Sequence, residues 1–321
     1  MNRTLSLLVA LPLLVAAPLV HAQAWPAKPV RLIVSYPPGG MTDTLGRVIG
    51  KELSEMWGVN VVVDNRPGAS GNIGTSLCVK SPPDGYTFCK VAVAQAMASR
   101  VLTSAGFDSL KDFSHVTLAA TVPMLLLAHP SLPVKTAADL IALAKRKPGS
   151  LNYASSGGGA SPQLAMELFK QQAGIDIMLI TYKGTGAAIV DQMAGRVEVA
   201  FNPAVGIIPF VQQGKLRALA VSTKDRFPVL AEVPTVSESG IKGYDASSWQ
   251  GISAPAGVPR EIVQKFSADT AKILKRPDIR DKILALGGVP VGNSPEEFSA
   301  FFRAESDKWL DVVKKGNIKI E

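Results

Sequence analysis

The stretch "VRLIVSYPPGGMTDTLGRVIGKEL", from Val30 to Leu53, contains the pattern on which the whole chain is built. Its first six residues are an apolar, β-branched run typical of a buried strand. A turn of prolines and glycines follows, and apolar residues then recur every three or four positions, which predicts a helix from Thr42 to Trp57 that Gly58 ends. The first turn of such a helix has backbone N–H groups without acceptors. The stretch therefore predicts both a fold class and a place where an anion could bind.

The alternation of strand and helix patterns continues along the chain. Residues 59–64 and 86–94 are predicted as further strands, and this β-α-β-α-β order is typical of a parallel sheet with helices on both faces. A second unit of the same kind begins at Met124, and its strands are predicted at residues 124–129, 151–156, 177–182, 197–202 and 216–222.

Several helix boundaries can be predicted from capping patterns. Ser161 and Pro162 are typical of an N-cap followed by proline at the first helical position, and another helix is expected around residues 187–194. Ser294, followed by Pro295 and two glutamates, predicts the start of the last long helix.

The length of the chain favours two domains. It has 321 residues, of which 47% are hydrophobic and 19% charged, which is globular but too large for one typical core. We expect residues 23–122 and 248–321 to form domain 1 and residues 123–247 to form domain 2. Because no flexible linker separates them, two crossings near residues 121–124 and 246–250 would act as a hinge.

The first residues have the features of a secretory signal peptide. Arg3 gives a positive start, Leu5–Val20 is apolar, and small residues allow cleavage after Ala22 or, alternatively, after Ala24. A membrane anchor is less well supported, because the apolar run is short and two prolines interrupt it. Removal of residues 1–22 would leave a soluble, exported chain.

The charge balance is basic. The formal net charge is +8, and loss of Arg3 with the signal leaves +7. A basic surface attracts anions. No cluster of lysines and arginines with interleaved aromatic residues is present, so nucleic acid is not an expected partner.

Two cysteines, Cys78 and Cys89, flank the turn "SPPDG". A disulfide between them is plausible in an exported protein if a helix ends before the turn and a strand follows it. Two buried free thiols are the alternative.

The arrangement of strand, glycine-rich turn and helix start occurs three times, in residues 35–43, 153–164 and 181–191. In an open parallel sheet, ligands lie beyond the carboxyl ends of the strands, where helix N-termini present unpaired N–H groups. Each turn alone could be a simple tight connection. Three of them, divided between two expected domains, favour a shared anion site in a cleft.

The known nucleotide motifs are absent from the sequence, and so are those of common enzymes. No stretch of the sequence has the spacing of a phosphate-binding loop or of a dinucleotide-binding fingerprint. Small carboxylates are therefore the expected anions. His115 and His129 lie away from the glycine-rich turns. Asp43 or Lys183 could serve as acid-base groups in an exported enzyme, but no catalytic set accompanies them, so binding is the better hypothesis.

Several segments, in order, give the chain a family resemblance. They are "WPAKPVRLIVSYPPGGMTD", "VVVDNRPGASGNIG", "PPDGYTF", "YKGTGAAIVDQMAGRVEVAFN", "GKLRALAVSTKDR", "VPTVSESGIKGY", "WQGISAPAGVP" and "PEEFSAFFRAESDKW". The chain resembles the receptors of tripartite tricarboxylate transporters, the Bug-type or TctC-like extracytoplasmic solute-binding proteins.

This resemblance implies an α/β, periplasmic binding protein type II-like fold, with two α/β domains around a ligand cleft and a double-crossing hinge. It also implies a monomer in the periplasm with no cofactor or metal and no enzymatic activity. The expected partners are a small carboxylate and the membrane subunits of a transporter, or alternatively a signalling protein.

The resemblance further implies which residues hold the ligand. One carboxylate would be bound by the backbone of two turns, and side chains of a third turn and of two strand ends would line the rest of the pocket. The expected ligand-binding residues are Pro38, Gly39, Gly40, Thr42, Asp43, Gln95, Ser156, Gly159, Ser161, Gln163, Lys183, Gly184, Thr185, Gly186, Ala187 and Asn202.

Three of these positions depart from the family pattern. Gln163 stands where many relatives have histidine, Asn202 where they have an acidic residue, and Ala187 where proline is frequent. Loss of a negative charge at Asn202 favours a ligand that is anionic at its far end, because unpaired like charges in a closed cleft are costly. A dicarboxylate is therefore expected, and aliphatic, aromatic and tricarboxylic acids all stay open.

Overall fold

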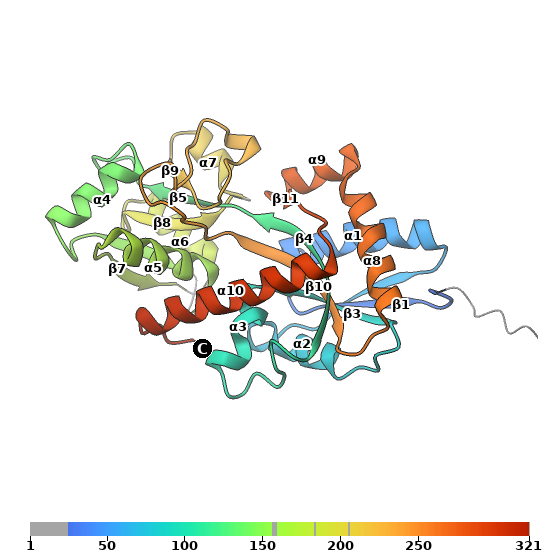
Figure 1. The fold of residues 1–321 in the computed structure, drawn as a ribbon. Helices are drawn as coiled ribbons and strands as arrows, with labels where there is room; N and C mark the ends of the chain where they lie inside the picture. The colour runs from blue at the N-terminus through green and yellow to red at the C-terminus, as the bar shows by residue number, and fades with distance from the viewer. Residues whose placement is uncertain (1–24, 156–158, 183, 205, 321) are drawn as a thin grey trace, which may run out of the picture.

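The computed structural model of the protein describes residues 25–155, 159–182, 184–204 and 206–320. Within these ranges the chain forms two sheets with helices packed on them (Figure 1). The first sheet has the strand order β11-β4-β10-β3-β1-β2, with β1 at Val30–Val34, β2 at Val61–Asn65, β3 at Thr87–Ala92, β4 at Phe113–Val122, β10 at Ser248–Pro255 and β11 at Val289–Pro290. The second has the order β7-β6-β8-β5-β9, with β5 at Met124–Ala128, β6 at Asn152–Ser155, β7 at Met178–Thr181, β8 at Val199–Pro203 and β9 at Arg217–Val221.

The helices cover both faces of the first sheet. One face packs against α1 (Met41–Trp57), α8 (Arg260–Leu274) and α9 (Pro277–Ala285). The other face packs against α2 (Asn72–Val79), α3 (Val93–Val101) and α10 (Pro295–Lys315). The remaining helical elements are the 3-10 turns η1 (Ala69–Gly71) and η2 (Pro228–Leu230) and the helices α4 (Ala137–Arg146), α5 (Ser161–Ala173), α6 (Thr185–Met193) and α7 (Ile208–Gln212).

The predicted parallel sheets are only partly confirmed. Strand β1 is parallel to β2 and β3, and β6 is parallel to β7 and β8. Strand β10, however, runs antiparallel between β3 and β4, and β5 runs antiparallel between β8 and β9. The prediction failed there because periodicity reports burial and not strand direction, and because β10 returns to the first sheet after the whole second sheet.

The chain passes between the sheets at two neighbouring places. Strand β4 ends at Val122 and β5 begins at Met124, so one crossing lies at Pro123. The return crossing lies between β9 and β10. The two are joined, since Ser222 Oγ accepts a hydrogen bond from the Met124 N–H (3.0 Å) and the Ser222 carbonyl accepts one from the Ala246 N–H (2.9 Å).

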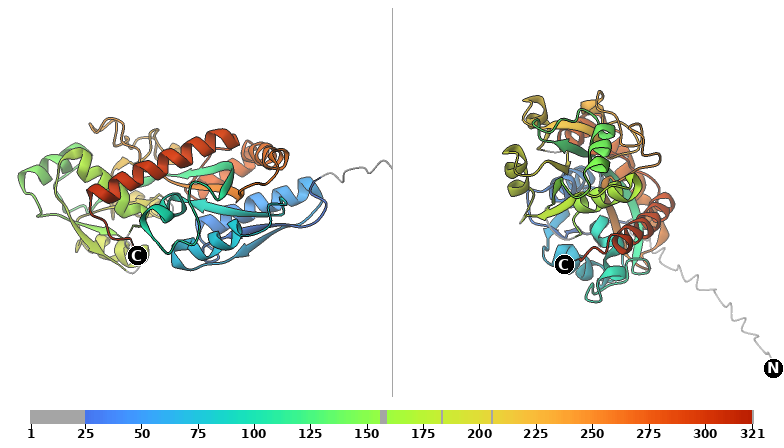
Figure 2. Two further views of the ribbon diagram at one scale, coloured as in Figure 1. Left: turned by 60° about the horizontal axis from the view of Figure 1, so that its bottom comes forward. Right: turned by 90° about the vertical axis from the view of Figure 1, so that its left-hand side faces the viewer.

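Helix α10 runs along both parts of the molecule (Figure 2). It packs against α3 and β4 near the first sheet and against α5 near the second. Two buried tryptophans, Trp249 and Trp309, donate to the same carboxylate oxygen of Glu305 at 2.8 and 2.7 Å, which fixes the helix to β10. The domain boundaries expected from the sequence stay a prediction, because α10 contacts both parts.

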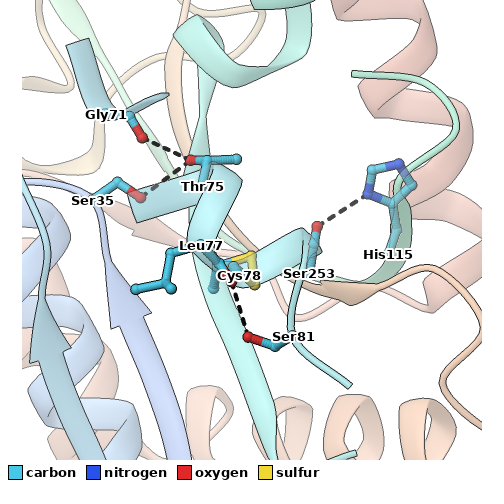
Figure 3. Close-up of a disulfide and its surroundings, with 9 residues drawn as sticks. Ser35, Gly71, Thr75, Leu77, Cys78, Ser81, His115 and Ser253 are labelled. Atoms are coloured by element: carbon cyan, nitrogen blue, oxygen red, sulfur yellow. Dashed lines mark hydrogen bonds between the residues drawn. A yellow bond between two sulfur atoms is a disulfide. The ribbon is translucent and has the colours of Figure 1, made fainter. Parts of the chain in front are cut away.

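Cys78 and Cys89 form a disulfide, one of the two alternatives that the sequence left open (Figure 3). It joins α2 to β3, with the two Cα atoms 6.0 Å apart and both side chains buried. One turn earlier in α2, Thr75 donates a hydrogen bond to the Gly71 carbonyl and contacts Ser35, the residue that follows β1. The glycine-rich segment before α2 is thereby held against the carboxyl end of the sheet.

Element boundaries differ from the predictions at a few residues. Strand β3 ends at Ala92 instead of residue 94, because α3 begins there. Ala160, and not Ser161, is the N-cap of α5, and Ser161 is already helical. The predicted start of α10 is confirmed, since Ser294 and Glu297 exchange side chain-to-backbone hydrogen bonds. Within the described residues, every helix is too short or too polar to cross a bilayer.

Candidate ligand-binding site

A cleft of about 510 Å³ opens between the two sheets. Thr42 of α1 lines one side, and Gly159 and Ser161 before and in α5 line the other. These three predicted site residues therefore meet at one cavity, which further residues of β3, α3, β10 and the C-terminal segment complete. Of the other predicted residues, Ser156 and Lys183 lie outside the described residues, and the rest do not line this cavity.

The first glycine-rich turn places the N-terminus of α1 at the cleft. Gly40 is the N-cap and has no side-chain capping bond, and the first helical backbone bond runs from the Thr44 N–H to the Gly40 carbonyl. The N–H groups of Met41, Thr42 and Asp43 therefore have no acceptor within the helix. They give this end of the cleft a positive partial charge.

The carboxylate of Asp43 is used inside the turn. It accepts the Gly39 N–H at 2.9 Å, the Asn65 amide at 2.9 Å and the Arg47 guanidinium at 3.0 Å. The Asp43 side chain is buried. Burial alone would raise its pKa, but the hydrogen bonds from Arg47, Gly39 and Asn65 outweigh burial and hold the pKa below its usual value. Gly39 and Asp43 thus shape the turn, and the Gly39 N–H is not a free donor.

The second glycine-rich turn begins α6. Gly184 is the N-cap, with φ 100°, a conformation that favours glycine. Thr185, Gly186 and Ala187 form the first helical turn, so their N–H groups also lack intrahelical acceptors. None of these four residues lines the cleft in this structure.

The third glycine-rich turn is braced by Gln163. Its side-chain oxygen accepts the Gly159 N–H at 2.8 Å, and the side chain is almost fully buried. Ile320 near the C-terminus packs against Gly159, where an added Cβ would lie 2.4 Å from the isoleucine Cδ1. The C-terminal segment therefore forms part of the cleft wall.

Gln95 and Asn202, predicted at strand ends, are committed to contacts within the protein. The Gln95 oxygen accepts the Ala92 N–H at 3.0 Å, and its nitrogen donates to the Ser70 carbonyl at 3.2 Å. Asn202 is buried and donates to Gln192 at 3.4 Å. Both side chains position neighbouring segments.

Five polar residues that line the cleft were not predicted: Tyr36, Ser70, Asn72, Ser248 and Gln250. Tyr36 and Asn72 adjoin glycine-rich segments, so their position in the sequence was an available signal. Gln250 had no such signal, because it reaches the cleft only through the placement of β10. The side-chain oxygens of Asn72 and Gln250 are buried without a hydrogen-bond partner among the described residues.

His115 and His129 lie apart from the cleft lining. His115 shares a hydrogen bond of 3.1 Å with Ser253, and burial lowers its pKa to about 4. His129 contacts Ser131 at 2.7 Å. In the part of the chain that the structure describes, no three His, Cys, Asp or Glu side chains gather as metal ligands would.

Comparison with known proteins identifies the family. Residues 45–318 match the tripartite tricarboxylate transporter family receptor, TctC. The chain belongs to this family. It is therefore a periplasmic solute-binding receptor of the TctC or Bug type, as the sequence predicted.

Individual relatives cover nearly the whole receptor. Protein BugT of Bordetella pertussis is 33% identical over 309 residues, which is 96% of this chain and 94% of BugT. The structure of Rpa4515 of R. palustris with adipate is 38% identical, with a TM-score of 0.78 over 92% of this chain and 99% of that one. MatC of Rhodopseudomonas palustris with bound malate is 28% identical, with a TM-score of 0.73 over 90% of this chain and all (100%) of that one.

Proposed function

We propose that the receptor captures a small dicarboxylate by closing its cleft and delivers it to the membrane subunits of a tripartite tricarboxylate-type transporter. The observation that carries the proposal is the free N-terminus of α1, which faces Gly159 and Ser161 across the cleft. Unpaired helix N–H groups and the helix dipole favour a carboxylate at such a place. The adipate and malate of the two related structures are both dicarboxylates.

One acid group of the ligand is assigned to two helix starts. The free N–H groups of Thr42 and Asp43 in α1 and of Thr185 and Gly186 in α6 are its donors. Because α6 does not line the cleft in this structure, its donors reach the ligand only when the cleft closes. The ligand then stabilises the closed state by contacts that the open state lacks.

The remaining residues that the sequence predicted have supporting roles in this proposal. Ser161 contacts the ligand directly. Gln95 and Asn202 position neighbouring segments. The others shape the glycine-rich turns, and they are Pro38, Gly39, Gly40, Gly159, Gln163, Gly184 and Ala187. The hinge consists of the crossing at Pro123 and the return crossing between β9 and β10, which Ser222 joins to Met124. The domains on either side have the boundaries expected from the sequence.

Binding without chemical conversion is part of the proposal. The acidic and histidine side chains described above are paired within the protein, and none is placed as a free proton carrier in the cleft. The same proposal has residues 1–22 removed on export and the mature receptor acting as a monomer in the periplasm.

A thermal-shift panel tests the proposal. The purified receptor would be melted with adipate, malate, citrate, nicotinate and terephthalate at graded concentrations. A ligand at 100 times its Kd should add about 2.7 kcal/mol to the free energy of unfolding. Chromatography after long incubation should recover that ligand unchanged. A panel in which no carboxylate raises the melting temperature would contradict the proposal.

A further inference from the structure

Lys90 is a buried lysine in the middle of β3. Its side chain is 0% exposed, and its ammonium nitrogen has no hydrogen-bond partner among the described residues. Lys90 stands opposite Ile252 of β10 and Val34 of β1. A Cβ added at Gly46 of α1 would lie 3.8 Å from Lys90 Cγ, so the lysine stem runs between the sheet and α1.

The same face of the sheet leads from Lys90 to the cleft. Ala92 lies two residues further along β3 and Gln250 is its partner in β10, so both share the face of Lys90. Both line the cleft, as does Thr42, one helical turn before Gly46. Two strand residues span about 6.6 Å, a distance that the four-carbon stem of a lysine can cover.

Within the described residues, Gln250 has a second unpartnered polar atom at this place, its side-chain oxygen. Its side chain is 6% exposed, and its buried oxygen has no partner among the described residues. A buried amide oxygen and a buried ammonium without partners each carry a cost of desolvation. A ligand carboxylate would give the ammonium its missing acceptor, and the ammonium, which has three N–H donors, would donate another of them to the Gln250 oxygen.

Among the residues that the structure describes, no charged group neutralises Lys90. On the elements packed against it, Asp43 pairs with Arg47 in α1, and Arg31 of β1 pairs with Asp64. Burial alone lowers the Lys90 pKa, to about 7, and no acidic side chain raises it. An anionic ligand would favour the charged form of the amine.

We propose that Lys90 and Gln250 form the receptor site for a second acid group of the ligand, at the floor of the cleft beside β10. This inference rests on the proposed function and narrows it to dianionic dicarboxylates. The ammonium of Lys90 reaches the floor by extending past Ala92, and the Gln250 side-chain amide donates to the same carboxylate. The first acid group stays with the helix N-termini.

A matched pair of ligands tests this site in the intact receptor. Adipate and its monomethyl ester have the same chain length but differ by one acid group, and malate with its monomethyl esters gives a shorter pair. Titration calorimetry should find the diacid bound about 10- to 100-fold more tightly, the effect of one hydrogen-bonded charge pair. In K90M the diacid should fall to the affinity of its ester, while the ester keeps its wild-type affinity.

Stability separates this role from a structural one. Methionine fills a similar volume, so K90M should melt at a higher temperature than the ligand-free wild type because a buried unpaired amine is removed. Thr270→Val is the control, since Thr270 in α8 also has a buried unpartnered atom, but no described residue of α8 lines the cleft, whereas Ala92 of β3 does. It should leave the ratio of diacid to ester affinity unchanged.

The outcomes are distinguishable. A K90M receptor that keeps the wild-type ratio of diacid to ester affinity would overturn the Lys90 site and leave the proposed function standing. If neither the wild type nor K90M bound any acid of the thermal-shift panel, the proposed function itself would fail, and the Lys90 site with it.

Discussion

At the scale of single residues, the buried charges of this receptor fall into two kinds. Asp43 is fully used, because three donors surround its carboxylate and fix the turn before α1. Lys90 is unused, because its ammonium meets no partner among the described residues. Paired charges commonly preserve a structure, whereas unpaired ones are costly to stability and so point to function.

The pairing of Asp43 should appear in the pH dependence of stability. Because its pKa is lowered in the folded state, Asp43 contributes stability above its unfolded pKa of about 4, which is lost as pH falls through the lower folded value. Asp43→Asn should lower the free energy of unfolding at pH 7 by about 1–3 kcal/mol. The difference from wild type should shrink on acidification, as followed by urea unfolding between pH 7 and pH 3.

The exposed Asp281 gives the control. Its side chain is 73% exposed and lies 4.0 Å from Arg280. Asp281→Asn should change stability little at any pH in this range. A constant difference between Asp43→Asn and wild type down to pH 3 would contradict a native ion pair at Asp43.

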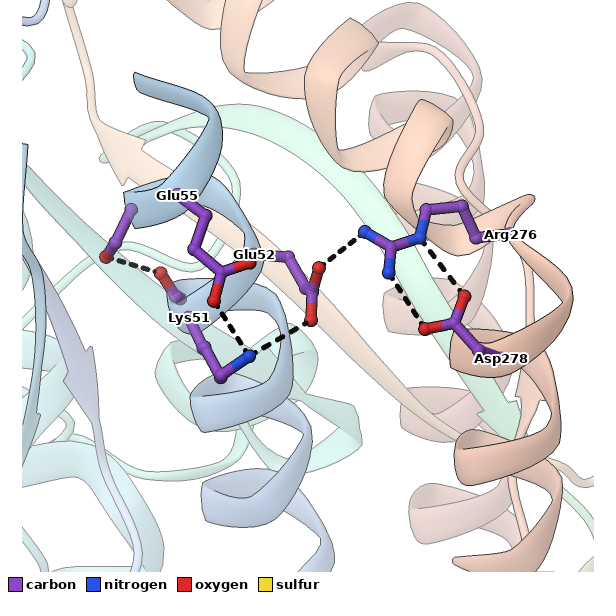
Figure 4. Close-up of polar contacts among 7 residues, drawn as sticks. Lys51, Glu52, Glu55, Arg276 and Asp278 are labelled. Atoms are coloured by element: carbon purple, nitrogen blue, oxygen red, sulfur yellow. Dashed lines mark hydrogen bonds and ion pairs between the residues drawn. The ribbon is translucent and has the colours of Figure 1, made fainter. Parts of the chain in front are cut away.

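At the scale of elements, α1 is fixed at both ends. Its N-terminus faces the cleft, and its C-terminal half is bound to Arg276, the N-cap residue of α9 (Figure 4). Arg276 pairs with the buried Glu52 of α1 and with Asp278 of α9, and Lys51 pairs with Glu55 in the same cluster. The helix that we propose as the source of ligand donors is therefore held by residues far away in the sequence.

Removal of Arg276 should destabilise the receptor. Arg276→Ala leaves the buried Glu52 carboxylate without its closest partner, so the melting temperature should fall by roughly 3–8 °C. Arg280→Ala removes an exposed arginine of the same helix region and should have almost no effect. Scanning calorimetry of both variants is the measurement, and equal melting temperatures would show that the cluster contributes nothing.

The elements also show how far sequence reasoning reaches. Local signals predicted the strand order along the chain, the helix starts near Thr42 and at Ser294 and the three glycine-rich turns, because turns and caps depend on neighbouring residues. The antiparallel insertion of β10 could not be predicted, since it depends on the return of the chain from the second sheet. The proposed role of Lys90 and Gln250 depends on that insertion, so no local pattern indicates it.

At the scale of the whole molecule, the two sheets are joined by adjacent crossings and by α10. We expect such a connection to permit rotation about the crossings only as far as α10 and its contacts with α5 allow. We expect closure upon the ligand to bring the first turn of α6 to the cleft. X-ray scattering with and without saturating adipate should then find a smaller radius of gyration in the bound receptor.

A pair of variants at Thr185 connects this motion to binding. Thr185 is the first residue of α6, where proline is tolerated and only the unpaired N–H is lost. Thr185→Pro should weaken adipate binding by about 10- to 100-fold, the cost of one hydrogen bond to a charged group. Thr185→Ala keeps the N–H and should bind like wild type. If Thr185→Pro bound adipate normally and compacted as wild type does, α6 would not contact the ligand, and the acid group would be held from the α1 side alone.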